Sequence, residues 1–197
     1  MVAVNQPQVS SWAKKPELRI GAVIAIALAF AFIVWLIVRG GGGGSSSETT
    51  ASTPTLPAVG PTIVGVTQLG TFADKAGHQV YWAGPIANKS YEFTQTPKAS
   101  IYIRYLPQGT RAGSKALFPL VGSYPVNDAY KVLQSLAKKQ GEISFPAPGS
   151  GIAVYSTMSP TNIYLAYPNS NVQIEVFDPS PKQARAMITS GQIAPVP

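Results

Sequence analysis

The hydrophobic positions of the chain fall into two zones with different patterns. Residues 20–38 form an unbroken run of 19 positions without a charged, amide or hydroxyl side chain. As a helix rising 1.5 Å per residue, this run would span about 28 Å, which matches the hydrocarbon core of a bilayer. From residue 62 onward, apolar residues alternate with polar ones or recur at helical spacing. The pattern therefore predicts one transmembrane helix at 20–38 and an α+β domain at 62–197.

The charges beside the apolar run predict its orientation. Three basic residues and one acidic residue lie within residues 1–19, whereas Arg39 alone follows the run. The positive-inside rule places residues 1–19 in the cytoplasm as a short tail and the C-terminal domain outside the cytoplasm. The run is longer than the core of a secretory signal, and the residues after it fit a cleavage site poorly. We therefore expect an uncleaved signal anchor in a single-pass protein of the cell membrane.

Residues 39–61 join the two zones and have the composition of a flexible linker. They are rich in Gly, Ser, Thr and Pro, contain no aromatic residue and show no apolar periodicity. The five glycines at 40–44 are not followed by the Gly-Lys-Ser/Thr of a phosphate-binding loop. A flexible linker of this length reaches roughly 25 Å, so it would tether the domain near the membrane without pressing it against the surface.

The globular zone is predicted to contain helices and short strands in a repeated order. Helical spacing occurs over 66–76 and 126–137, and Ser180-Pro181 begins a short last helix. The strand-like runs are 78–83, 91–96, 100–106, 151–157, 162–167 and 172–177. Short turns between consecutive strands favour antiparallel pairing. The expected fold is α+β, an antiparallel sheet of about six strands with two or three helices on one face.

The two halves of this zone read in the same order, one helix and then three strands. Matching them in sequence pairs 100–106 with 172–177, and an internal duplication would explain the likeness. Any two three-stranded meanders share such a pattern, however, so chance explains it equally well.

Alternation along the strands separates an aliphatic face from a face rich in tyrosine. Tyrosine offers a large contact area and a hydroxyl group, and it loses little rotamer entropy on binding. Tyrosine is also common on sheet faces that bind no other molecule, because it has a high β-strand propensity. An ordinary solvent-exposed surface is therefore the alternative. The candidate binding residues on this face are Tyr81, Tyr102, Arg104, Tyr155 and Tyr164.

Composition and charge limit the kinds of site and the kinds of partner that we expect for this chain. The chain has no Cys and one His, which excludes disulfides, thiolate sites and a multi-histidine metal site within one chain, and we expect no cofactor. Absence of Cys from an extracytoplasmic domain is more typical of a bacterial envelope than of a eukaryotic secreted protein. The net charge of the chain is +7. Outside the cytoplasm a basic domain favours a protein or an anionic envelope polymer as partner and makes nucleic acid an unexpected one.

No catalytic motif is complete. Ser135 and Lys138 have Ser-x-x-Lys spacing but lack the companion motifs of penicillin-recognising enzymes. Glu92 and Glu175 would suit glycosidic cleavage only if their carboxyl groups lay about 5–10 Å apart. The sequence therefore favours a membrane-anchored envelope protein with a binding or scaffolding domain, such as an accessory subunit of a membrane complex. An envelope enzyme acting on a cell-wall or polysaccharide substrate is the alternative.

Overall fold

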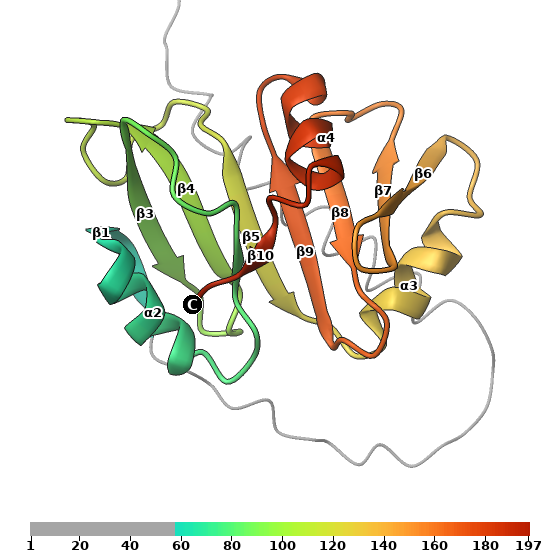
Figure 1. Ribbon diagram of the computed structural model, residues 1–197, viewed down its shortest axis with the longest axis horizontal. Helices are drawn as coiled ribbons and strands as arrows, with labels where there is room; N and C mark the ends of the chain where they lie inside the picture. The colour runs from blue at the N-terminus through green and yellow to red at the C-terminus, as the bar shows by residue number, and fades with distance from the viewer. Residues whose placement is uncertain (1–57) are drawn as a thin grey trace, which may run out of the picture. The chain divides into compact units, whose positions relative to one another are not determined.

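A computed structural model describes residues 58–197, which are built on a large antiparallel sheet (Figure 1). Its eight strands lie in the order β1-β3-β4-β5-β9-β8-β7-β6. Their bounds are β1 Val59–Val64, β3 Lys89–Gln95, β4 Ile101–Pro107, β5 Leu120–Pro125, β6 Glu142–Ala147, β7 Gly151–Ser156, β8 Asn162–Ala166 and β9 Val172–Phe177. A second sheet pairs β2 (Tyr81–Trp82) with β10 (Ala194–Pro195). Together with three helices, these sheets confirm the predicted α+β class and the antiparallel pairing.

The main sheet consists of two four-stranded meanders that meet in the middle. Strands β1, β3, β4 and β5 form one half, β6 to β9 form the other, and β5 pairs with β9. By position, β4 therefore corresponds to β8, and each contains an Ile-Tyr pair, Ile101-Tyr102 and Ile163-Tyr164. The sequence pattern instead pairs residues 100–106 with 172–177, which correspond to β4 and β9. This pairing is shifted by one strand because β5 was not predicted.

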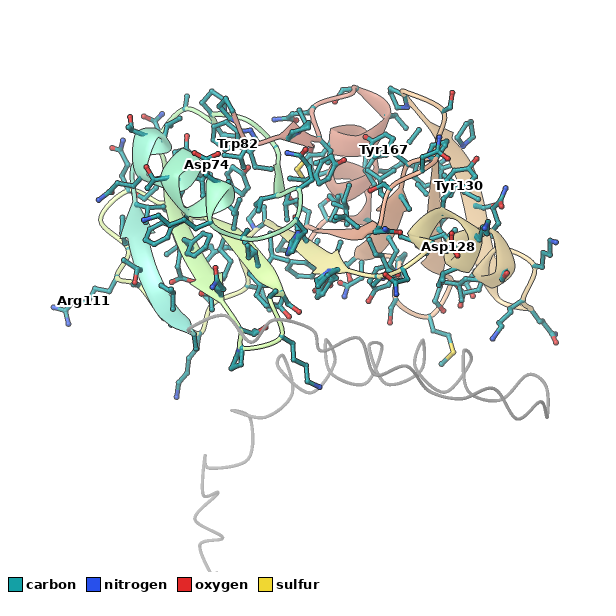
Figure 2. All side chains as sticks on the ribbon, turned by 90° about the horizontal axis from the view of Figure 1, so that it is seen from below. Asp74, Trp82, Arg111, Asp128, Tyr130 and Tyr167 are labelled. Atoms are coloured by element: carbon teal, nitrogen blue, oxygen red, sulfur yellow. The ribbon has the colours of Figure 1, made fainter. Side chains whose placement is uncertain are left out.

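Helices cover both faces of this sheet. Helices α2 (Val66–Asp74) and α4 (Pro181–Thr189) lie on one side, and α3 (Ala129–Leu136) lies on the other (Figure 2). The face under α2 and α4, here called the core face, carries side chains that are fully buried, such as Phe93, Ile103 and Ile174. The prediction of two or three helices on one face thus holds for two, while α3 packs on the opposite face, here called the polar face.

Three strands of the main sheet were not predicted. β1 begins within the stretch assigned to the linker, so residues 59–61 belong to the sheet. β5 lies in the connection that follows residue 106 and contains Gly122 and Pro125, which weaken a strand pattern. β6 is an edge strand with Pro146 inside it. Each is short or interrupted, and its strand conformation depends on the neighbour with which it pairs.

The end of the chain packs against the core face. Ile193 and Val196 are buried, and the backbone nitrogen of Val196 donates to the carbonyl oxygen of Val80 at 2.9 Å. Within residues 58–197 no helix has the length and apolar character needed to cross a membrane. The predicted transmembrane helix at 20–38 lies outside the described residues.

Candidate binding face

The strand register gathers polar side chains in the middle of the polar face. Tyr102 on β4 lies opposite Gly122 on β5, Gly122 lies opposite Glu175 on β9, and Glu175 lies opposite Tyr164 on β8. Residues directly opposite one another on neighbouring strands point to the same face. Four strands thus contribute one row of positions, and the row crosses the joint between the two halves of the sheet.

Gly122 gives this row its arrangement because it leaves room for a tyrosine ring. A Cβ atom at position 122 would lie 3.0 Å from both Cε2 and Oη of Tyr124, the residue two positions further along β5. The ring of Tyr124 therefore lies against the bare backbone of β5. From there its hydroxyl group donates a hydrogen bond to Oε2 of Glu175 on the neighbouring strand.

Glu175 is a buried carboxyl group with hydrogen-bond donors but without a basic partner. It is 4% exposed, and its Oε1 accepts a hydrogen bond from Nδ2 of Asn162 at 3.0 Å. Among residues 58–197 it makes no salt bridge. Burial raises the pKa of the Glu175 carboxyl group, and the hydrogen bond from Tyr124 offsets part of that rise. The surroundings therefore favour the protonated form more than water does.

Three tyrosines surround this carboxyl group. The rings of Tyr102 and Tyr124 meet edge to face, with centroids 5.6 Å apart. Burial raises the pKa of Tyr102, Tyr124 and Tyr164, and the negative charge of Glu175 raises each of them further. Tyr102 is half-buried and packs on the ring of Tyr124, whose hydroxyl group donates to Glu175, so these contacts lead from the surface to the buried carboxyl group. We call Tyr102, Tyr124, Asn162, Tyr164 and Glu175 the Glu175 cluster.

Beside this cluster, an ion pair fixes the connection between β4 and β5. Nη1 of Arg104 lies 2.6 Å from Oε1 of Glu92, which is 1% exposed. Nη2 of Arg104 donates to the carbonyl oxygens of Ser114 and Ala116 at 2.9 and 2.8 Å. Oε2 of Glu92 accepts a hydrogen bond from the backbone of Gly113 at 2.5 Å. Arg104 and Glu92 thus hold residues 108–119, here called the strap.

The structure separates the five candidate binding residues. Tyr102, Arg104 and Tyr164 share the polar face, but Arg104 is engaged by Glu92 and the strap, and Tyr164 is only 7% exposed. Tyr81 and Tyr155 were assigned to this face wrongly. Tyr81 lies in β2 within the core cluster, and Tyr155 packs against it beside Phe145 with ring centroids 6.3 Å apart.

Tyr102 is therefore the one predicted tyrosine that lies on the polar face and stays half-exposed. Tyr124 was missed because β5 was not recognised as a strand. The signal that could have identified it is the short Leu120–Pro125 run, in which Val121 and Ser123 alternate with Gly122 and Tyr124.

Glu92 and Glu175 do not form the carboxylate pair considered from the sequence. Glu92 lies on β3 and Glu175 on β9, with β4 and β5 between them. Three strand spacings correspond to about 14 Å, which exceeds the separation that glycosidic cleavage needs. Glu92 is also ion-paired with Arg104.

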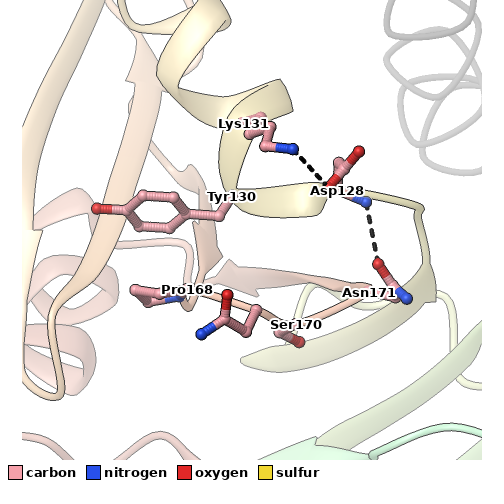
Figure 3. Close-up of a pocket in the computed structure, with 7 residues that line it drawn as sticks. Asp128, Tyr130, Lys131, Pro168, Ser170 and Asn171 are labelled. Carbon is pink, nitrogen blue, oxygen red and sulfur yellow. Dashed lines mark hydrogen bonds and ion pairs between the residues drawn. The ribbon is translucent and has the colours of Figure 1, made fainter.

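A surface hollow lies elsewhere, between the start of α3 and the β8–β9 turn (Figure 3). It has a volume of about 380 Å³ and is lined by Asp128, Tyr130, Lys131 and residues 168–171. The backbone nitrogen of Asp128 donates to Oδ1 of Asn171 at 3.0 Å, and Lys131 pairs with Asp128 at 3.2 Å. These contacts join a turn to a helix, and the hollow offers no unpaired charged group.

Comparison of the chain with protein-family models, with curated proteins and with solved structures finds no match.

Proposed function

We propose that the chain is a single-pass, membrane-anchored envelope protein whose C-terminal domain binds a partner protein outside the cytoplasm. In this proposal it is an accessory subunit of a membrane complex. The observation that carries the proposal is the pair formed by the half-buried Tyr102 and Tyr124 over the centre of the polar face. On that face α3 packs on β7, β8 and β9 and leaves β4 and β5 to the tyrosines and the strap.

The chemistry of this pair suits a protein contact. A tyrosine ring offers apolar area and a hydroxyl group at once, and tyrosines are enriched among residues that dominate binding energy. Tyr102 is held by its edge-to-face contact with Tyr124. Because the ring is already ordered, little conformational entropy remains to be lost when a partner binds.

The anchor in this proposal is the apolar run at residues 20–38, and its orientation follows from the flanking charges. The chain contains no Cys, so single cysteines report topology cleanly. We expect a membrane-impermeant maleimide to label Ser47→Cys and Lys98→Cys in intact cells, and Ser10→Cys only after lysis. Labelling of Ser10→Cys in intact cells, or protection of Lys98→Cys, would overturn the proposed location.

The binding surface is tested by substitution of its accessible tyrosine. Tyr102→Ala in the tagged full-length chain is expected to reduce recovery of the co-purifying partner by roughly tenfold, the size of a central contact residue. Tyr130→Ala on α3 is the matched control, because Tyr130 is likewise half-exposed but lies at the hollow. Equal recovery with wild type and both variants would contradict the assignment of the surface.

The alternative of an envelope enzyme acting on polysaccharide gains no support from the described residues. Its two carboxylates lie three strands apart, and one of them is ion-paired.

A further inference from the structure

The fold brings together basic residues that are far apart in the sequence. The register places Arg104 of β4 in one row with the terminal residues Leu120 of β5, Phe177 of β9 and Asn162 of β8, and β4 continues from this row to the strap. Glu142 at the start of β6 lies opposite Ser156 at the end of β7, at this same end of the sheet. The strap, the α3–β6 connection and the β7–β8 turn therefore share one end of the sheet, the upper end in Figure 1.

This end carries exposed positive charge, and we call it the cationic end. It is formed by Arg111 and Lys115 of the strap and by Lys138 and Lys139 after α3. All four are exposed, and within residues 58–197 none makes a salt bridge. Figure 2 shows Arg111 pointing away from the domain. The charges are thus available to a partner.

Few carboxylates offset these charges. Glu92 is engaged by Arg104, and Oδ1 of Asp178 accepts a hydrogen bond from the backbone of Ser180 at 2.8 Å. Glu142 feels the charge of Lys139, but burial dominates and raises the pKa of the Glu142 carboxyl group. The cationic end therefore keeps a positive potential.

The spacing of the charges points to an extended ligand. The strap leaves from β4, and Lys138 and Lys139 lie next to β6, five strands away in the sheet order. Five strand spacings correspond to about 24 Å, which is too wide for one small anion. Lysine is a compact point charge that does not require a particular geometry of its partner. Repeated anionic groups along a polymer fit this arrangement.

The start of β1 lies far from the cationic end within the sheet. Val59 at the start of β1 pairs with Gln95, and Val64 at its end pairs with Tyr91. Residue 59 therefore enters at the end of the sheet opposite the strap, since β3 runs from Lys89 near the strap to Gln95. The start of β1 and the cationic end therefore lie at opposite ends of the sheet.

We propose that the cationic end binds an anionic polymer that carries repeated phosphate or carboxylate groups. This inference deepens the proposed function by naming a second partner, and it uses residues that the tyrosine surface does not use. The source of the polymer depends on the proposed location of the domain outside the cytoplasm. The binding of the polymer to the cationic end does not depend on that location.

The test compares two triple variants of the full-length chain in a neutral detergent, with long-chain inorganic polyphosphate and poly-glutamate as probes. Lys115, Lys138 and Lys139 are replaced by Gln in one variant, and the exposed residues Lys75, Lys98 and Lys131 in the other. Both lose the same charge. At about 50 mM salt we expect the first variant to lose roughly tenfold in affinity for at least one polymer and the second less than about threefold. The salt dependence of binding should weaken only in the first variant.

Two results would overturn the proposal. Equal losses in both variants would mean that overall charge, rather than the cationic end, attracts the polymer. Failure of both polymers to bind, with lysine-dependent binding to phosphatidylglycerol vesicles instead, would assign this end to the lipid surface. Co-purification of the partner protein is also measured with the first triple variant, which keeps Tyr102. Polymer binding at the cationic end and protein binding at the tyrosine surface can therefore fail independently.

Discussion

The hydroxyl group of Tyr124 donates a hydrogen bond to the buried carboxyl group of Glu175, across the strand pair that joins the two halves of the sheet. The ring of Tyr124 reaches this position by lying against Gly122, which is the residue opposite Glu175. Tyr102 packs edge to face on the same ring. The half-exposed surface of the polar face thus depends on a polar contact inside the sheet.

Removal of the Tyr124 hydroxyl group tests the contribution of this hydrogen bond. Tyr124→Phe leaves Oε2 of Glu175 without its donor, so the free energy of unfolding should fall by about 1–3 kcal/mol. Tyr130→Phe is the control and should change the free energy of unfolding by less than about 0.5 kcal/mol. Urea unfolding followed by circular dichroism measures both. Equal effects of the two substitutions would show that the bond to Glu175 contributes nothing specific.

A methyl group at position 122 should displace the Tyr124 ring. The added Cβ would lie 3.0 Å from two ring-end atoms of Tyr124, so Gly122→Ala should cost about 1–3 kcal/mol of stability. Gly60→Ala in β1 is a matched control in a strand, because a Cβ there meets no atom within 4 Å. Thermal unfolding of both variants gives the comparison. A Gly122→Ala protein as stable as Gly60→Ala would disprove the close approach.

The raised pKa of Glu175 makes the stability of the domain depend on pH. The folded-state pKa lies above the ordinary value of 4.5. The folded protein therefore holds this proton more tightly than the unfolded chain does, and stability is lost as pH rises through the folded pKa. We expect the free energy of unfolding to rise as the pH falls from 7 toward 4.5, and Glu175→Gln to flatten that slope. Identical slopes in the two proteins would contradict the burial argument.

Arg104 should control how firmly the strap is held. Arg104→Lys keeps a positive charge near Glu92 but cannot reproduce the bonds to Ser114 and Ala116 as well as to Glu92. We expect trypsin to cut at Arg111 and Lys115 several-fold faster in this variant, because cleavage follows the population of the open strap. Cleavage after Lys98 in the β3–β4 turn serves as the internal control and should keep its rate. Unchanged cleavage in the strap would mean that other contacts hold it.

Sequence pattern predicted the elements whose apolar positions follow one clear period. Strands β3, β4, β8 and β9 and helices α2 and α4 were found close to their observed bounds, because each has one apolar face directed at the core. In β7 both sets of alternate positions are apolar, since the sheet there is covered on both faces. The period of two could not choose between the faces, and Tyr155 was placed on the wrong one.

The candidate site was less predictable because it depends on pairing. Tyr102 was identified by alternation, but the Glu175 cluster requires β5 to lie between β4 and β9. The cationic end could not be predicted from the sequence for the same reason. Its residues lie in two connections more than 20 positions apart in the sequence, and only the strand order brings these connections to one end.

Photo-crosslinking in cells tests whether the polar face around Tyr102 is a docking surface. A photoreactive residue is placed at position 102 of the full-length chain, and a second chain carries it at Glu48 in the linker as the control. We expect a discrete protein adduct from position 102 that is absent from position 48. If position 102 gives no adduct, or only adducts that position 48 also gives, the polar face is an ordinary solvated sheet surface and the account is wrong.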